Sequence, residues 1–165
     1  MGTTRLVSRR RQDSGAKWAR IAMAVLATAG LIDTGSITLK RWGLLGNLTC
    51  PMGADGCDKV LNSAWGTVFA EIPLSLIGVL AYGAVLLMAL LPLLPGLQEN
   101  KADLSRRTWW GLFTVSLAMA VFSGVLLGVM LLKIQAFCFF CVLSAGLSLA
   151  LFVLSIVGGG WDDLG

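Results

Sequence analysis

Four long apolar segments constrain the fold of this chain more than any other feature of its sequence. Each is close to the roughly 20 residues that an α-helix needs to cross the hydrocarbon core of a bilayer. Inside that core every backbone polar group must be satisfied within its own segment, so the segments are expected to be helices. They are predicted at residues 21–39, 72–94, 109–132 and 137–157. The sequence therefore predicts an all-α membrane protein, built as a four-transmembrane-helix bundle.

The composition supports a membrane protein and removes several kinds of chemistry. Hydrophobic residues make up 56% of the chain and charged residues 13%, whereas about a quarter of the residues in a soluble domain are charged. The net charge of +4 is modest, so no nucleic-acid partner is implied. The chain contains no histidine, the commonest metal ligand and a frequent general base. Its chemistry must come from cysteine, carboxylate or lysine side chains, or from a bound cofactor.

The positively charged residues predict the orientation of the bundle, because loops rich in Lys and Arg stay on the cytoplasmic side. The amino-terminal arm and the loop between the second and third spans carry nine of them: Arg5, Arg9, Arg10, Arg11, Lys17, Arg20, Lys101, Arg106 and Arg107. The opposite side carries four: Lys40, Arg41, Lys59 and Lys133. Both chain ends are therefore expected in the cytoplasm.

This orientation divides the chain into three parts. Residues 1–20 are expected to form a basic cytoplasmic arm, residues 21–157 the transmembrane domain with an outer loop at 40–71, and residues 158–165 a tail or linker. A signal peptide is the alternative for the beginning of the chain. The first apolar block runs for about 20 residues without a small-residue cleavage site before its end, so it is interpreted as a retained helix.

The outer loop carries two of the four cysteines, Cys50 and Cys57, in a segment rich in glycine and proline that favours turns. Asp58 follows as a possible cap of a short helix. Beyond it, apolar residues recur at spacings of three and four, as in an amphipathic half-helix lying on the membrane or capping the bundle. These residues are Val60, Leu61, Ala64, Trp65, Val68 and Phe69.

The other two cysteines form the motif Cys138-Phe-Phe-Cys141, which is expected to open the fourth span at its outer end. A thiol at the beginning of a helix has a lowered pKa, and the thiolate is the form that attacks disulfides. Lys133 nearby is expected to act in the same direction. Cys138 is predicted to lie nearer the outer water and Cys141 one helical turn deeper in the bundle.

Both cysteine pairs therefore face one compartment, which must permit disulfides. Two structural disulfides are the plainest alternative, although so short a loop as Cys-x-x-Cys is an inefficient crosslink. A four-cysteine zinc site is a second alternative, and the spacing of Cys50 and Cys57 fits it poorly. A third reading, a small-molecule transporter, conflicts with the scarcity of polar residues in the spans.

Asp33 lies inside the first predicted span. A carboxyl group in hydrocarbon is costly and indicates a functional site, so Asp33 is a candidate proton donor. The alternative is a polar contact with Thr34, Ser36 or a neighbouring helix.

The ordered motifs resemble those of the vitamin K epoxide reductase family, most closely its bacterial and cyanobacterial members. The two loop cysteines come first, followed by Trp65-Gly66, Ile72-Pro73-Leu74-Ser75 with Gly78, and Cys-Phe-Phe-Cys at the start of the fourth span. The resemblance runs over roughly residues 21–157. Oxidases of the DsbB type carry the two kinds of pair in the opposite order.

The resemblance implies a thiol–disulfide oxidoreductase in which a membrane quinone lies among the helices beside Cys141. The quinone would be of the ubiquinone, menaquinone, phylloquinone or plastoquinone type, with no metal. Cys138 would exchange disulfides with a loop cysteine, and Cys50 and Cys57 would meet the partner. By alignment to the family, five residues are brought toward the quinone, although ordinary packing accounts for each as well: Val60, Leu61, Ser75, Leu126 and Met130.

The resemblance also implies a partner and a membrane. The partner would be a thioredoxin-like protein of the periplasm or lumen, often fused through a fifth span; this chain shows neither feature, so a separate partner or a longer parent chain is expected. The membrane would be a bacterial inner membrane or a thylakoid. Animal members hydrogen-bond vitamin K through an Asn and a Tyr at positions that here hold Leu74 and Ala145. Plain quinone reduction is therefore favoured over the alternative, reduction of vitamin K epoxide.

Overall fold

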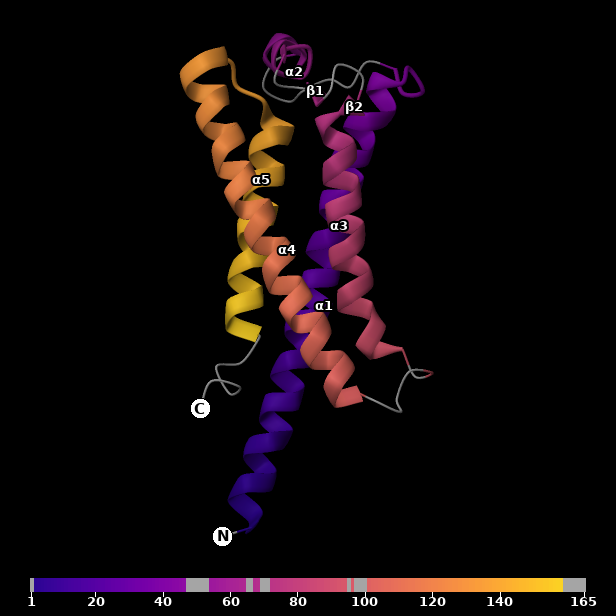
Figure 1. Cartoon of the computed structure of the whole chain (residues 1–165), viewed down its shortest axis with the longest axis vertical. Coiled ribbons are helices and arrows are strands. Elements are labelled where there is room, and N and C mark those ends of the chain that lie inside the picture. Colours follow the sequence, from indigo (N-terminus) through magenta and orange to yellow (C-terminus); the bar gives the residue numbers. More distant parts are fainter. Residues whose placement is uncertain are drawn as a thin grey trace.

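The computed structural model describes residues 2–46, 54–64, 67–68, 72–94, 96 and 101–158. Four long helices run along one another (Figure 1): α1 spans Gly2–Arg41, α3 Leu74–Leu90, α4 Lys101–Val129 and α5 Phe139–Gly158. Within the described part of the chain, four helical stretches are long and apolar enough to cross a membrane, namely Ser14–Arg41, Leu74–Leu93, Asp103–Ile134 and Phe139–Gly158. The predicted four-helix membrane bundle is confirmed.

The ends of the helices differ from the sequence-based boundaries. The segment 2–20, predicted as an arm outside the first span, continues α1 without a break, because it contains no proline that would interrupt the helix. A 3₁₀ turn at Leu91–Leu93 ends α3. At the other end of the bundle, α4 runs into a π-helical turn at Met130–Ile134, and Gln135 then adopts the left-handed conformation with φ of 50°. That residue turns the chain back toward α5.

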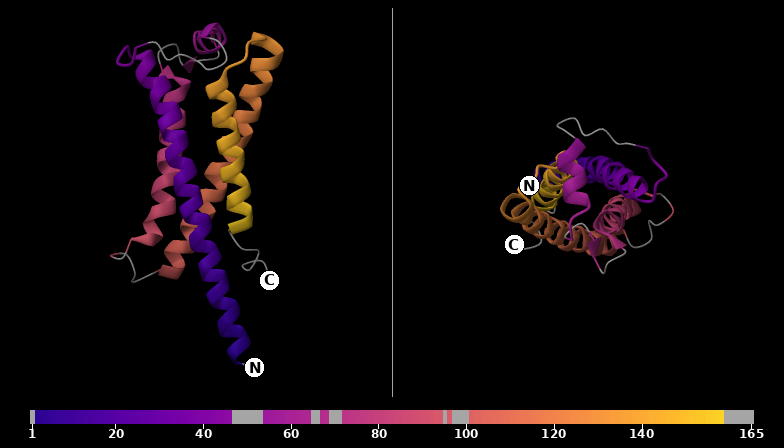
Figure 2. Two further views of the ribbon diagram at one scale, coloured as in Figure 1. Left: turned by 180° about the vertical axis from the view of Figure 1, so that it is seen from behind. Right: turned by 90° about the horizontal axis from the view of Figure 1, so that it is seen from above.

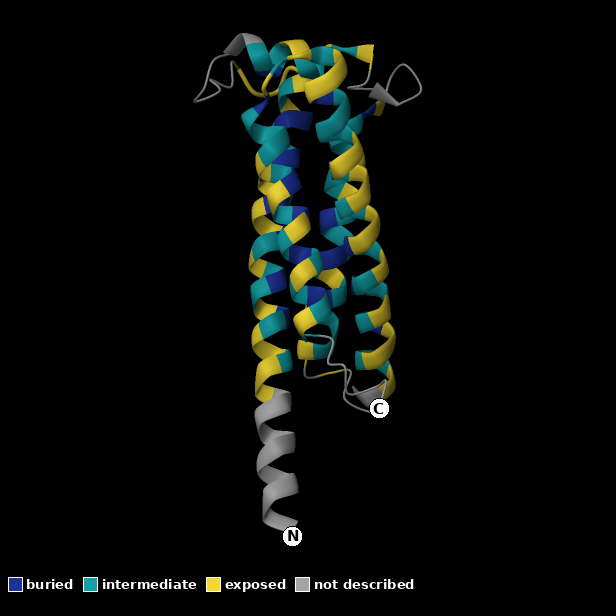
Figure 3. Cartoon of the chain, turned by 90° about the vertical axis from the view of Figure 1, so that its left-hand side faces the viewer, coloured by how far each residue is buried: buried dark blue, intermediate teal, exposed yellow. Residues whose placement is uncertain are grey.

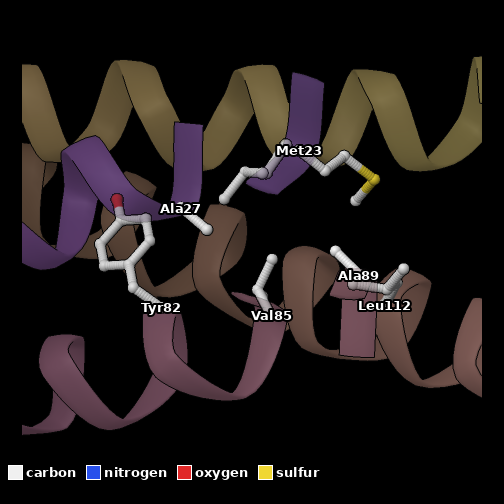
Figure 4. Packing of buried hydrophobic residues seen from close by; sticks show 7 residues of the cluster. Met23, Ala27, Tyr82, Val85, Ala89 and Leu112 are labelled. Atoms are coloured by element: carbon white, nitrogen blue, oxygen red, sulfur yellow. The ribbon is translucent and has the colours of Figure 1, made fainter. Parts of the chain in front are cut away.

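The interior of the bundle is filled by side chains from all four helices. α1 packs against α3 and α5, and α4 packs against α5 and α3. The central cluster (Figure 4) consists of Met23, Ala27, Tyr82, Val85, Ala89, Leu112 and Leu151. Exposed residues lie along the outer faces of the helices (Figure 3), and many of them are large and apolar. Such an apolar outer surface is suited to contact with lipid.

Small residues allow α1 and α3 to approach closely. A side chain at Gly30 would overlap the ring of Tyr82, and one at Gly78 would overlap the methyl group of Thr34. Membrane helices commonly use glycine in this way, because without lateral hydrophobic attraction their association depends on close packing.

Arg20 joins three helices at the end of the bundle where α1 and α4 begin. Its side chain is buried and donates hydrogen bonds to the carbonyl oxygen of Met88, to Ser105 and to Thr108. Its guanidinium group also lies 4.9 Å from the centre of the Trp109 ring. These partners use most of the donors that a guanidinium group offers, so Arg20 is a structural crosslink.

The opposite end of the bundle is crossed by a short helix. Seen from above (Figure 2), α2, Ala54–Leu61, lies over the ends of the long helices. Lys40 forms a 2.8 Å ion pair with Asp58, and Arg41 donates a 2.7 Å hydrogen bond to the carbonyl oxygen of Leu61. These two contacts connect α2 to the end of α1.

The short helix is present, but it begins and ends earlier than predicted. Asp58 lies within α2 and is not its cap. The helical spacing expected to continue to residue 69 is wrong at 67–68, where β1, Thr67–Val68, pairs antiparallel with β2, Ile72–Pro73. β-Branched residues favour such extended pairing. Trp65, Gly66 and Phe69 lie outside the described residues.

A cysteine pair beside an apolar cavity

Cys57 and Cys138 come together at the α2 end of the bundle. Cys57 is the fourth residue of α2 and is 2% exposed, and Cys138 immediately precedes α5 and is 0% exposed. With Met130 they form one buried cluster, against which Cys141 packs. Cys57 is disulfide-bonded, whereas Cys50 lies outside the described residues. Two segments far apart in the sequence thus place their sulfur atoms in the same apolar environment.

Gly56 makes this approach possible. Its backbone lies against the carbonyl group of Phe137, and an added Cβ atom would overlap that oxygen. Gly56 precedes Cys57 and Phe137 precedes Cys138 in the sequence. The contact between the two backbones therefore fixes the relative position of the two cysteines.

Cys138 and Cys141 are both free thiols, and their Sγ atoms lie 2.7 Å apart. The length of a disulfide bond is about 2.05 Å, so the pair needs only a small movement to form one. The carbonyl oxygen of Cys138 accepts the backbone N–H of Val142, which makes Cys138 the first capping position of α5. The motif therefore opens the fourth span, as predicted.

The local environment of Cys138 lowers the pKa of its thiol below the ordinary value. The hydrogen bond from the Cys141 thiol is the largest cause, and the backbone N–H groups of Phe140 and Cys141 act in the same direction. Burial opposes them, as does the charge of Asp33. Lys133, expected to help, is exposed and contributes nothing to this shift.

The expected order along α5, with Cys141 one turn deeper than Cys138, is present, but Cys138 is not the more exposed of the two. Cys138 is fully buried because α2 and Cys57 cover it, whereas Cys141 is only partly buried. One turn further along α5, Cys141 opens onto an internal cavity. Cys138 is thus buried beneath α2, whereas Cys141 faces the cavity.

The cavity has a volume of about 800 Å³ and is lined by residues of α1, α2, α3, α4 and α5. Its wall contains every residue that the family resemblance brought toward a quinone, namely Val60, Leu61, Ser75, Leu126 and Met130. Leu74 is also in the wall, whereas Ala145 is buried outside it. A mostly apolar cavity of this size is typical of sites for small organic molecules.

Asp33 is buried, with 6% of its surface exposed, and it is not part of the cavity wall. Among the described residues neither of its carboxyl oxygens has a hydrogen-bond partner. Its carboxyl group makes no hydrogen bond with Thr34 or Ser36, because the Thr34 hydroxyl donates to the carbonyl oxygen of Gly30 and the Ser36 hydroxyl to the backbone carbonyl oxygen of Asp33. The next residue, Thr34, lines the same cavity as Cys141.

Sequence reasoning missed Tyr82 and Ser144, which both line the cavity. The Tyr82 hydroxyl donates a 2.8 Å hydrogen bond to the Ser144 carbonyl oxygen and lies 3.1 Å from the Ser144 hydroxyl. Tyr82 is the single tyrosine of the chain. The sequence feature that could have identified this site is a single tyrosine within an otherwise apolar predicted span. Among the described residues, no three His, Cys, Asp or Glu side chains gather to hold a metal ion.

Comparison with known proteins gives a consistent result. Residues 21–156 match the vitamin K epoxide reductase family. Over 134 residues, 76% of this chain, the sequence is 33% identical to the thiol-disulfide oxidoreductase LTO1 of Arabidopsis thaliana. The aligned part is 33% of that relative's length, so the chain spans about a third of it. The order of the cysteines, the four spans and the family match agree, and the chain belongs to the vitamin K epoxide reductase family.

Proposed function

We propose that this chain is a membrane thiol–disulfide oxidoreductase that takes electrons from a thioredoxin-like partner and passes them to a membrane quinone. The observation that carries the proposal is the packing of Cys57 against Cys138, while Cys141 of the same pair faces the cavity. This geometry provides a contact for exchange on one side and a place for an electron acceptor on the other. The family match and the Arabidopsis relative support the same chemistry.

The exchange begins with an oxidised Cys138–Cys141 pair. A thiolate of the reduced partner attacks Cys50 of the loop disulfide and releases Cys57 as a thiolate. Cys57 then attacks Cys138, with which it is packed, and Cys141 leaves as a thiolate. When Cys50 and the second partner thiol resolve the two mixed disulfides, the partner holds a new disulfide and the Cys138–Cys141 pair is a dithiol.

The cavity fits a quinone by its volume and by its largely apolar wall. Val60 and Leu61 of α2, Ser75 of α3, and Leu126 and Met130 would hold it. A bound quinone accepts the two electrons and two protons that the dithiol loses when it becomes a disulfide. Cys141 is the cysteine on the cavity wall, so it is the residue from which the electrons leave the protein.

Asp33 is the candidate acid of the reaction. Its carboxyl group is buried next to Thr34, which lines the same cavity as Cys141, and it would hold a proton released by a thiol. The replacement Asp33→Asn keeps the shape of the side chain and removes its acidic proton. Unchanged quinone turnover in that variant would remove Asp33 from the mechanism.

The wall of the cavity favours plain quinone reduction over epoxide reduction. Leu74 offers no hydrogen bond at the position where animal members use an Asn, and Ala145 lies outside the wall. Purified protein assayed with a quinone and with its epoxide distinguishes the two activities. We expect turnover with the quinone alone.

The proposed orientation puts both cysteine pairs on the periplasmic or lumenal side, with the chain ends in the cytoplasm. The α2 end of the bundle carries both Cys57 and Cys138, and α1 begins at the opposite end (Figure 1). The basic residues near the start of α1 and of α4 support a cytoplasmic location for that end.

The decisive experiment measures oxidation of a reduced thioredoxin-like protein by this chain in liposomes, with and without an added quinone, followed optically. Oxidation should depend on the quinone and should stop in Cys141→Ser. The control is Ser155→Ala, which removes a buried hydroxyl from α5 outside the cavity. Full quinone-dependent oxidation by Cys141→Ser would contradict the proposal.

A further inference from the structure

Among the described residues, no hydrogen bond links the buried carboxyl group of Asp33 to the cavity. Both of its oxygens are unpartnered among the described residues, and Asp33 is absent from the cavity wall. A buried polar group without a hydrogen bond costs free energy and calls for an explanation. If Asp33 exchanges protons with a molecule in the cavity, another side chain must carry them.

Tyr82 occupies the position that such a carrier requires. It projects from α3 toward α1 with its hydroxyl at the far end (Figure 4) and lines the cavity. The absence of a side chain at Gly30, almost one helical turn before Asp33, allows the ring to reach α1. Tyr82 therefore packs against the turn of α1 that leads to Asp33 and also lines the cavity.

The hydroxyl of Tyr82 also lies next to the redox pair. It is held by Ser144, which follows Cys141 by one turn of α5 and lines the same cavity. The other titratable residues of the wall are Cys141 itself and three residues near α2. Of those three, Lys40 and Asp58 are paired with each other and Arg41 is bonded to Leu61, which leaves Tyr82 as the available proton carrier.

We propose that the Tyr82 hydroxyl, held by Ser144, passes protons from Asp33 to a quinone in the cavity while Cys141 supplies the electrons. This inference rests on the proposed function. Oxidation of the Cys138–Cys141 dithiol releases two electrons and two protons. For each of the two protons, Tyr82 gives its phenol proton to a quinone oxygen and regains one from Asp33, which in turn takes up a proton released by the dithiol. The relay therefore acts twice for each quinone. Thiol protons therefore end on the quinol, and no further reactant is needed.

The first test uses Tyr82→Phe, which keeps the ring against Gly30 and removes the hydroxyl. General acid catalysis typically contributes a factor of about 10² to 10⁴, so we expect quinol formation to slow by about 10²-fold or more. Oxidation of the partner in a single turnover without quinone should be unchanged. Ser144→Ala keeps the carbonyl acceptor and should slow quinol formation less. Ser155→Ala serves as the control outside the cavity.

The second test does not depend on turnover. Infrared difference spectra of the protein in its oxidised and reduced states report the carboxylic acid C=O band of Asp33, which is assigned by its loss in Asp33→Asn. Exchange of that proton for deuterium should be slower in Tyr82→Phe than in the parent protein. An Asp33 band that is absent, or that exchanges equally fast in both proteins, would overturn the inference.

Biosynthetic fluorotyrosine provides a third test that avoids misfolding of the phenylalanine variant. Because Tyr82 is the only tyrosine, the label changes this residue alone and makes its phenol more acidic. The pH profile of quinol formation should move to lower pH; a purely structural tyrosine would leave it unmoved. If Cys141→Ser is inactive but Tyr82→Phe and the fluorinated protein behave like the parent, the inference fails while the proposed function stands.

Discussion

Because Gly56 has no side chain, the segments that carry Cys57 and Cys138 can approach each other closely. Gly56 allows the backbone of α2 to lie against the carbonyl group of Phe137, and in this way Cys57 reaches Cys138. The sequence-based interpretation treated this glycine only as part of a segment that favours turns. Its position within α2 shows that the requirement is close packing and not flexibility.

The variant Gly56→Ala tests this role. The added methyl group must push α2 away from Phe137, so exchange between the loop pair and the Cys138–Cys141 pair should slow by about tenfold to a hundredfold. Rapid-quench trapping of the mixed disulfide measures the rate. Gly124→Ala is the matched control, because nothing lies within 4 Å of the added atom there. Equal rates in the two variants would contradict the proposed contact.

The reactivity of Cys138 should depend on pH in a specific way. Because its pKa is lowered, its thiolate forms at lower pH than that of an ordinary cysteine near 8.5. The rate of alkylation should therefore rise with pH around a midpoint below 8.5. Mass spectrometry of Cys138 after timed exposure to a small permeant reagent gives this midpoint.

Two variants should move the midpoint in opposite directions. Cys141→Ala removes the hydrogen bond that lowers the pKa of Cys138, so the midpoint should rise. At pH values where Asp33 is ionised its charge raises this pKa, so the midpoint should fall in Asp33→Asn. Burial of Cys138 slows alkylation at every pH and does not alter the direction of either shift. A midpoint that stays fixed in both variants would refute this explanation of its reactivity.

At the scale of whole helices, sequence-based prediction succeeded for features that depend on composition. It failed for features that depend on contacts between segments distant in the sequence. The four spans follow from hydropathy, and the cysteine motif marks the start of α5 as predicted. The short helix was misplaced because its apolar spacing continues into residues that pair as strands. The relative exposure of Cys138 and Cys141 depends on α2 lying above them, which no local pattern records.

Arg20 connects three helices and should contribute measurably to stability. Arg20→Ala removes several hydrogen bonds from a buried charged group, each worth about 1.5–3 kcal/mol, so we expect a loss of at least about 2 kcal/mol in unfolding free energy. Arg20→Lys should recover only part of this, because lysine lacks the forked geometry. Unfolding in mixed micelles measures the change. The control is Arg107→Ala, which alters an exposed side chain, and an equal loss in that variant would contradict the assignment.

At the scale of the molecule, the proposal requires both cysteine pairs on one face of the membrane. In a cysteine-free background, single cysteines restored at 57 or 138 should react from one side of intact vesicles, and Ser14→Cys should react from the other. An impermeant thiol reagent distinguishes the sides, and brief mild detergent gives the total. Labelling of residues 57 and 138 from opposite faces would refute the proposed electron path.

The cavity extends along much of the length of α4. Its wall extends along α4 from Val115 to Met130, which at 1.5 Å per residue is about 22 Å. Cys141 lies near the end covered by α2, so an occupant whose ring touches this sulfur leaves the remaining length free for a flexible chain. Analogues with progressively truncated isoprenoid tails should therefore lose affinity in steps, even though the part that undergoes chemistry is identical in each.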